Sequence, residues 1–129
     1  MPLTKSGRNF MAGATVGEET TLFDEANAHI GVGDGDNEFD ETQTDLQGEN
    51  TFREGMDEDF PVREDNELTF RATFGEEDAN FVWNEWGVFN ADDGGVMLNR
   101  LVEFNGEKQP GQTWIFQVTL EIRIGVVEE

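Results

Sequence analysis

Apolar residues stand at six successive even positions between Trp114 and Ile124, and polar or charged residues fill most of the odd positions between them. Side chains alternate between two faces along a β-strand, so this pattern is typical of a strand with one buried and one exposed face. Leu68 to Phe74 shows the same alternation over a shorter length. Both segments therefore predict half-buried strands.

Further strands are expected at Ala26 to Gly33, at Phe81 to Phe89 and at Val96 to Phe104. The last two flank an Asp-Asp-Gly-Gly run at 92–95, which is a strong hairpin signal. In Phe81 to Phe89 we expect Phe81, Trp83 and Glu85 on one face, with Val82 and Trp86 on the other.

The remaining segments are less regular. Thr4 to Val16 predicts a short helix, although two internal glycines weaken it. Gly33 to Asp45 predicts a polar, acidic loop, Thr42 to Leu46 a short helical turn, and Thr51 to Pro61 an irregular connection. Short strands joined by glycine-containing turns favour one mainly β domain over residues 1–129. We expect an antiparallel β-sandwich, jelly-roll-like, or a small barrel, with a short N-terminal helix.

The charge is strongly unbalanced: 29 acidic residues stand against 8 basic ones, which gives a formal net charge of -21. The acids are spread along the whole chain, so the entire folded surface is expected to be acidic. Such a surface repels itself in ordinary salt, whereas molar salt shortens the screening length to about 3 Å. This favours a protein that folds in brine; an acidic protein that docks on a basic partner is the alternative. Nucleic-acid binding is not expected, because phosphate contacts need a basic face.

The chain has no cysteine, which excludes disulfides and thiolate sites. Its 11 phenylalanines and 3 tryptophans lie in periodic segments, which argues against a disordered chain. No signal peptide or membrane span is evident, so no membrane partner is expected.

Four carboxylates recur at every second position of the acidic loop: Asp34, Asp36, Glu38 and Asp40. This spacing resembles the first half of a calcium loop. The glycine and the bidentate glutamate that such a loop needs are absent from the matching positions. We therefore expect a hydrated loop that binds cations loosely, with a specific cation site as the alternative, and no other cofactor.

We expect no enzyme, although a small hydrolase, which would show a pocket with two carboxylates of unlike pKa, stays open. His29 and Ser6 are the only histidine and serine, and they form no pattern typical of a catalytic triad. Gly31, Gly33 and Gly35 follow a strand but lack the helix and lysine of a phosphate-binding loop.

Glu85 lies between Trp83 and Trp86 in an apolar strand, and a carboxylate buried there needs a partner. Arg71 and Arg100, on neighbouring expected strands, are the candidates for a structural charge pair. Exposed tryptophans at 83, 86 and 114 would stack on sugars, and a carbohydrate-binding module is therefore the alternative function. Tryptophans in a small β domain more often pack in its core.

Three segments carry a family resemblance: Ala28 to Asp34 with Thr44 to Gln47, Phe70 to Arg100, and Lys108 to Leu120. Together they resemble small virion-associated proteins of tailed bacteriophages and their archaeal relatives, over about Leu3 to Leu120. Within them, the segment 84–90 is similar to a strand and turn of phage tail-fibre attachment domains. This chain departs from the bacterial members mainly in its surface acids, such as Glu76, Glu77, Asp92 and Asp93, which fits an archaeal virus of brine.

The resemblance implies a non-enzymatic structural component of the virion, without catalytic residues. It fits the tail or baseplate as well as a capsid decoration or turret protein. We expect a homo-oligomer whose partners are other capsid or tail proteins and the host cell surface. Phe23, Phe39 and Phe104, in weakly patterned regions, are the candidates for intersubunit contacts.

Overall fold

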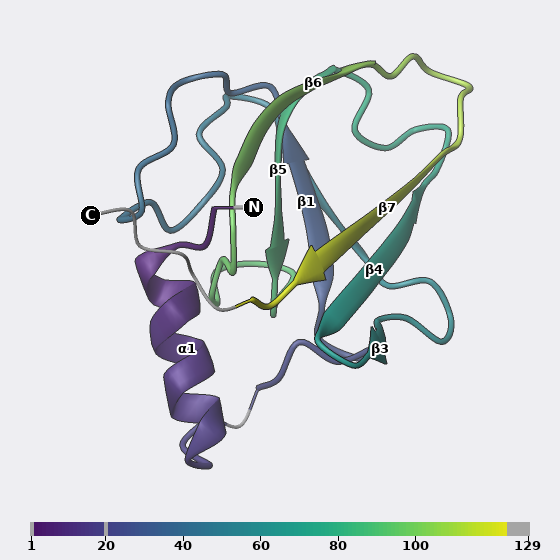
Figure 1. Cartoon of the computed structure of the whole chain (residues 1–129). Helices are drawn as coiled ribbons and strands as arrows, with labels where there is room; N and C mark the ends of the chain where they lie inside the picture. The colour runs from purple at the N-terminus through teal and green to yellow at the C-terminus, as the bar shows by residue number, and fades with distance from the viewer. Residues whose placement is uncertain (1, 20, 124–129) are drawn as a thin grey trace.

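The segments with alternating apolar and polar residues form strands of two antiparallel β-sheets, and one helix lies beside the sheets (Figure 1). The computed structural model describes residues 2–19 and 21–123. In chain order its elements are α1 (Lys5–Thr15), β1 (His29–Gly33), β2 (Thr51–Gly55), β3 (Val62–Glu64), β4 (Glu67–Phe74), β5 (Val82–Phe89), β6 (Leu101–Glu107) and β7 (Trp114–Glu121). The expected mainly β domain with a short N-terminal helix is confirmed.

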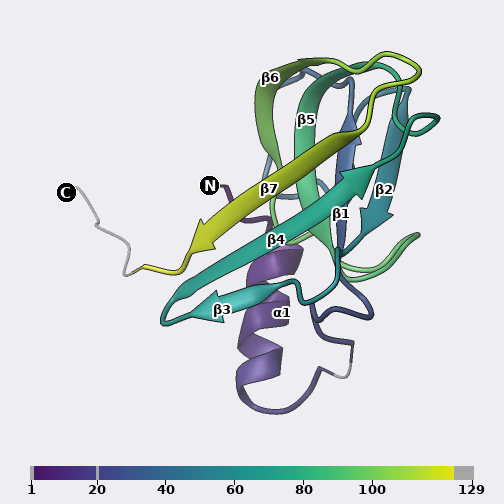
Figure 2. The ribbon, with the colours of Figure 1, turned by 90° about the vertical axis from the view of Figure 1, so that its right-hand side faces the viewer.

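The two sheets are the layers of a sandwich. One has the strand order β2-β1-β5-β6 and the other β3-β4-β7, and every pairing is antiparallel. Figure 2 shows the strands of the three-stranded sheet crossing in front of the four-stranded sheet, with α1 at one end. The edges of the sandwich are therefore β2 and β6 in one layer and β3 and β7 in the other.

Aromatic rings fill much of the space between the layers. The ring of Phe74 lies 4.8 Å from that of Trp83, and Trp83 lies 4.9 Å from Trp114. Phe116 contacts both Trp83 and Trp86, at 5.5 and 5.9 Å. Burial of apolar area of this kind contributes about 25 cal/mol per Å². The buried members of this core are Ala28, Ile30, Val32, Phe70, Ala72, Phe74, Ala79, Trp83, Trp86, Val88, Leu98, Val118 and Leu120.

β7 follows the alternation that predicts it. Val118 and Leu120 are buried, whereas Ile115 is 66% exposed. Its partner β4 mirrors the pattern, since Phe70 pairs with Val118 and both face the core. The strand ends at Glu121, and Ile124 lies outside the described residues.

The expected faces of β5 are wrong at one position. Trp83 packs in the same core as Trp86 instead of sharing a face with Glu85. The pairing with β6 shifts register between Trp83 and Glu85, so the alternation is broken there. Beyond the shift, the Trp83 ring sits among Phe74, Trp114 and Phe116, and its indole N–H donates to the carbonyl of Ala79 at 2.9 Å.

α1 begins where Thr4 caps it, because the Thr4 hydroxyl accepts a hydrogen bond from the N–H of Gly7 at 2.8 Å. Gly7 weakens the helix but lets it approach closely, since a Cβ atom there would collide with the carbonyl of Leu98. Phe10 faces inward on the same side. Within the described residues, no helix is long and apolar enough to cross a membrane.

Three expectations need correction. Part of the irregular segment Thr51 to Pro61 is the edge strand β2, which pairs with β1 through Arg53 and Glu54 despite their charges. Thr42 to Leu46 forms turns and no helix. The return strand begins at Leu101 instead of Val96; before it, Met97 forms an isolated bridge with Phe89, and Asn99 forms one with Leu3 of the N-terminal segment.

Phe74→Ala is expected to lower the free energy of unfolding by about 3–5 kcal/mol, because it leaves a cavity beside two other aromatic rings. Val16→Ala, at a side chain 68% exposed, is the control and should change stability by less than about 0.5 kcal/mol. Urea unfolding followed by circular dichroism at high salt measures both. Equal effects of the two substitutions would show that the aromatic layer is not the core.

Candidate functional site

Two fully buried charged residues, Glu85 and Arg100, meet in the four-stranded sheet, and both are 0% exposed. Glu85 lies on β5, and Trp86 and Val88 of that strand face the core. By strand alternation, Glu85 therefore points to the outer face of the four-stranded sheet. A long loop, residues 34–50, covers this face, and we call it the 34–50 loop (Figure 1).

The carboxylate of Glu85 is held by backbone N–H groups of the 34–50 loop. Gly35 and Gly48 donate to Oε2 at 3.0 and 2.8 Å, and Gln47 donates to Oε1 at 2.9 Å. Hydrogen bonds to an ionised group are stronger than those between neutral groups. Glu85 thus fixes both ends of the loop onto the sheet.

Arg100 supplies the opposite charge and reaches the middle of the same loop. Its Nε donates to Glu85 Oε1 at 2.7 Å. One terminal nitrogen donates to the carbonyl of Asn37 and to Gln43 Oε1, at 3.2 and 3.1 Å, and the other donates to Asn37 Oδ1 at 3.1 Å. The guanidinium therefore has an acceptor for each of its three nitrogens.

Of the two arginines expected to pair with Glu85, Arg100 does so and Arg71 does not. Arg71 lies on β4 in the other sheet, where Phe70 and Ala72 face the core and turn Arg71 outward. It pairs instead with Asp57, at 2.8 Å, and its guanidinium lies 4.4 Å from the ring centre of Phe60. Strand pattern alone did not reveal that β4 and β5 belong to different sheets.

The 34–50 loop is closed at its base and packed through Leu46. Asp34 and Asn50 join its ends, since the backbone and side-chain N–H groups of Asn50 donate to the Asp34 carboxylate at 3.1 and 2.8 Å. Leu46 packs with Phe89 and Met97 in a second apolar cluster. The loop therefore covers apolar surface as well as the charge pair.

The four carboxylates expected to bind a cation are not brought together. Asp34 is engaged by Asn50, and Asp40 accepts hydrogen bonds from the N–H and hydroxyl of Thr42 at 2.8 and 2.6 Å. Asp36 and Glu38 are exposed. Among residues 2–19 and 21–123, no three histidine, aspartate or glutamate side chains are placed to hold a metal ion. Loose cation binding stays a prediction.

Local hydrogen bonds explain why the pKa values of two aspartates in the loop lie below their ordinary values. At Asp34 burial raises the pKa, but the hydrogen bonds from Asn50 outweigh it and hold the pKa below its ordinary value. The hydroxyl and N–H of Thr42 lower the pKa of Asp40. Away from the loop, burial and the negative charge of Asp78 raise the pKa of Glu54.

The glycine run at 31–35 is the signal that sequence reasoning undervalued. A Cβ atom on Gly35 would lie 2.7 Å from Glu85 Oε2, and one on Gly33 would collide with the same oxygen. The run does receive an anionic group, but that group is a carboxylate of the protein itself. The amide side chains of Asn37 and Gln43 carried no sequence signal for their contacts with Arg100.

Lys108 is a second buried cation that sequence reasoning missed. It is 1% exposed, and its ammonium donates to the carbonyl of Gly75 at 2.6 Å and to Asn80 Oδ1 at 2.8 Å. These contacts join the turn after β4 to the turn after β6. Its position beside Gln109 and Pro110 gave no indication of burial.

The other candidate residues are structural or exposed. His29 is half-buried and its Nδ1 lies 2.8 Å from the carbonyl oxygen of Asn27. Trp83 and Trp86 are 1% and 5% exposed, so the structure forms no exposed tryptophan platform from them. Phe23 packs edge-on against Phe10 at 4.9 Å.

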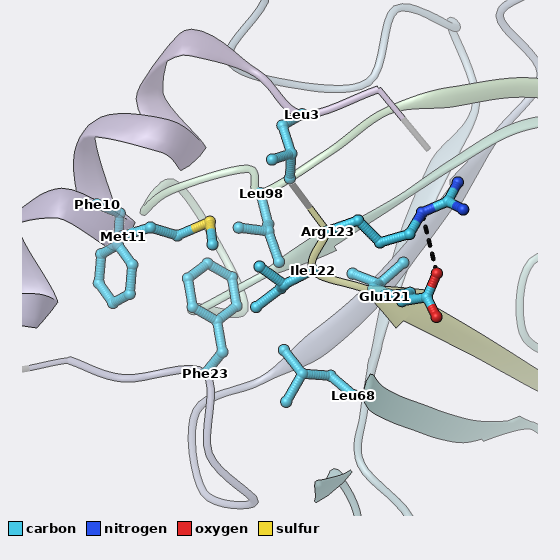
Figure 3. Close-up of a pocket in the computed structure, with 10 residues that line it drawn as sticks. Leu3, Phe10, Met11, Phe23, Leu68, Leu98, Glu121, Ile122 and Arg123 are labelled. Carbon is cyan, nitrogen blue, oxygen red and sulfur yellow. Dashed lines mark ion pairs between the residues drawn. The ribbon is translucent and has the colours of Figure 1, made fainter. Parts of the chain in front are cut away.

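Among the expected intersubunit residues, Phe104 is the accessible one. It is 71% exposed on the edge strand β6, whereas Phe39 is half-buried in the 34–50 loop. Phe23 lines an apolar cavity together with residues of α1 and the end of β7 (Figure 3).

That cavity has a volume of about 420 Å³. Its walls are apolar side chains such as Leu3, Phe10, Met11 and Leu98. Its charged residues, Glu121 and Arg123, form an ion pair of 3.0 Å, and both side chains are exposed to solvent. In Figure 3 the labelled side chains around it are apolar apart from this ion pair.

Chemically, the Glu85 centre is a clasp. Its carboxylate and guanidinium are shielded from solvent and satisfied by protein donors and acceptors, so they hold a loop and face no substrate space.

No protein-family model and no curated protein matches the chain.

Glu85→Gln is expected to lower the free energy of unfolding by about 3–5 kcal/mol, because it leaves the Arg100 charge buried without its counter-charge. Hydrogen exchange at the amides of Gly35, Gln47 and Gly48 should also accelerate. The matched control is Glu41→Gln, which breaks the half-exposed pair with Arg8 and should cost about 0–1 kcal/mol. A stable Glu85→Gln protein with unchanged exchange would contradict the clasp.

Proposed function

We propose that this chain is a non-enzymatic structural component of a tailed virus particle, assembled from several copies. The observation that supports this most directly is the use of the buried polar groups. Glu85 and Arg100 are buried charged residues of the kind that enzymes use for catalysis, but here their hydrogen bonds hold the 34–50 loop in place. A protein whose function is to present a fixed surface needs such a loop clasp and needs no open catalytic pocket.

The distribution of charge supports a particle that assembles in brine. Two of the eight basic residues, Arg100 and Lys108, are buried together with one acid, Glu85, so the exposed surface is slightly more acidic than the composition indicates. Copies of such a protein repel each other until salt screens them. Two placements fit the proposal: the tail or baseplate, and a capsid decoration or turret that meets the host surface.

The proposal predicts salt-dependent assembly. From about 0.1 M to about 3 M KCl, light scattering should show a discrete oligomer that appears as the salt rises, with circular dichroism reporting a folded protein at high salt. Sucrose of equal osmolality is the control, because it does not screen charge and should not restore the oligomer. A folded monomer at every salt concentration would contradict both the adaptation to brine and the assembly into an oligomer.

Placement in a particle has its own test. Antibodies raised against the recombinant chain, coupled to gold, should label intact particles from the culture that carries the gene. Label on the head supports a decoration or turret protein, and label on the tail supports a baseplate or fibre component. Particles without label, together with the protein free in the supernatant, would contradict the proposal.

Tryptophan fluorescence separates this proposal from a sugar-binding module. Because Trp83 and Trp86 are buried, their emission should be blue-shifted and unchanged by added mono- and oligosaccharides. Free tryptophan amide in the same buffer is the control for direct quenching. Emission that shifts saturably with one sugar would favour the carbohydrate-binding alternative.

A further inference from the structure

The four edge strands of the sandwich differ in how they are protected against pairing with another chain. An edge strand presents unpaired backbone N–H and C=O groups, and proteins usually guard it with charges, bulges or short length. β3 is only 3 residues long, and β6 has an irregular register beside Asn84. Charges lie within β2, β3 and β6, namely Arg53, Glu54, Arg63, Glu64, Glu103 and Glu107.

β7 has none of these protections. It is 8 residues long, pairs regularly with β4 over its whole length, and carries no charge before its last residue, Glu121. The residues between Lys108 and Glu121 form the longest uncharged run of this highly charged sequence. Within the part of the chain that the structure describes, β7 has a neighbouring strand on one side only, as Figure 2 shows.

The direction of the free backbone groups follows from the ladder. The N–H of Ile122 donates to the carbonyl of Asn66 at 2.9 Å, just beyond the last residue pair of β4 and β7. Hydrogen-bonded pairs alternate along an antiparallel ladder, so the even residues of β7 bond to β4. The odd residues Ile115, Gln117 and Thr119 therefore direct N–H and C=O groups to the free edge, while their side chains are exposed.

We propose that β7 is the intersubunit strand, and that two copies of this chain pair their β7 strands antiparallel across a two-fold axis, with Gln117 opposite Gln117. This inference rests on the proposed assembly into a homo-oligomer and names its contact. The product is one continuous sheet with the order β3-β4-β7-β7-β4-β3. A two-fold contact closes on itself and leaves no uncharged edge exposed.

Electrostatics selects this edge. Two chains of charge -21 repel each other wherever their acids meet, and the β7 edge is the one where neither copy brings a carboxylate until Glu121. Pairing β7 with β6 would bring Glu103 and Glu107 into the contact. β3 is too short to match β7, and β2 is held by Arg53, which donates to the carbonyls of Ala91 and Gly94 at 2.9 Å.

Proline at position 117 tests the contact. Gln117→Pro removes an N–H that points to the free edge and that β4 does not use, so the fold should survive while strand pairing is blocked. In about 3 M KCl the mass by light scattering should fall at least twofold relative to wild type. Gln117→Ala, which keeps the N–H, is the matched control and should retain the wild-type mass.

A cysteine cross-link gives a second readout that does not depend on the fold tolerating proline. The chain has no cysteine, so a disulfide in Gln117→Cys reports one contact alone. Cα atoms of a hydrogen-bonded antiparallel pair lie about 5.5 Å apart, within disulfide range. Oxidation should yield covalent dimers of Gln117→Cys but not of Phe104→Cys, whose site on β6 is 71% exposed.

The outcomes separate the inference from the proposed function. A wild-type monomer at all salt concentrations overturns the assembly itself. A wild-type oligomer whose mass is unchanged in Gln117→Pro, or one that cross-links through position 104 and not 117, overturns the β7 contact and leaves the assembly standing.

Discussion

The interaction on which the rest of this structure depends is the buried pair of Glu85 and Arg100. Removing two charges from water costs several kcal/mol for each ion, and their attraction offsets this only with good geometry and further hydrogen bonds. Here the backbone N–H groups of Gly35, Gln47 and Gly48 supply those bonds. The pair thereby holds the 34–50 loop in one position. The same loop covers the second apolar cluster, so the pair also keeps that cluster covered.

The small number of basic residues also affects the charge of the surface. A chain with few cations places Arg100 and Lys108 inside, where each joins segments that are distant in sequence, and uses Arg53 to link β2 to the turn after β5. Few basic groups then remain to neutralise the exterior. The fold holds its own loops with internal cations, and the acids on the exterior repel one another to the extent that solvent ions do not screen them.

Sequence reasoning succeeded where one physical rule acted alone. Strict alternation predicted β4 and β7, and Thr4 to Val16 predicted α1 closely. It failed where two constraints compete: Arg53 and Glu54 hid β2, because charges on an edge strand resemble a loop, and the register shift beside Trp83 broke the alternation of β5. In the site, burial between tryptophans pointed to Glu85, but only the fold decides that Arg100 and not Arg71 lies in the same sheet.

The placement of α1 has a consequence for the order in which the chain folds. Its capping residue Thr4 donates from its hydroxyl to the carbonyl of Met97, and the N–H of Thr4 donates to that of Leu98 at 3.1 Å. The capping residue of α1 is thus held by backbone groups that follow it in the chain by more than 90 residues. Contacts between such distant segments are slow to form. We expect α1 to dock late, so a nascent chain shorter than about Arg100 holds an amphipathic helix with nothing to cover it.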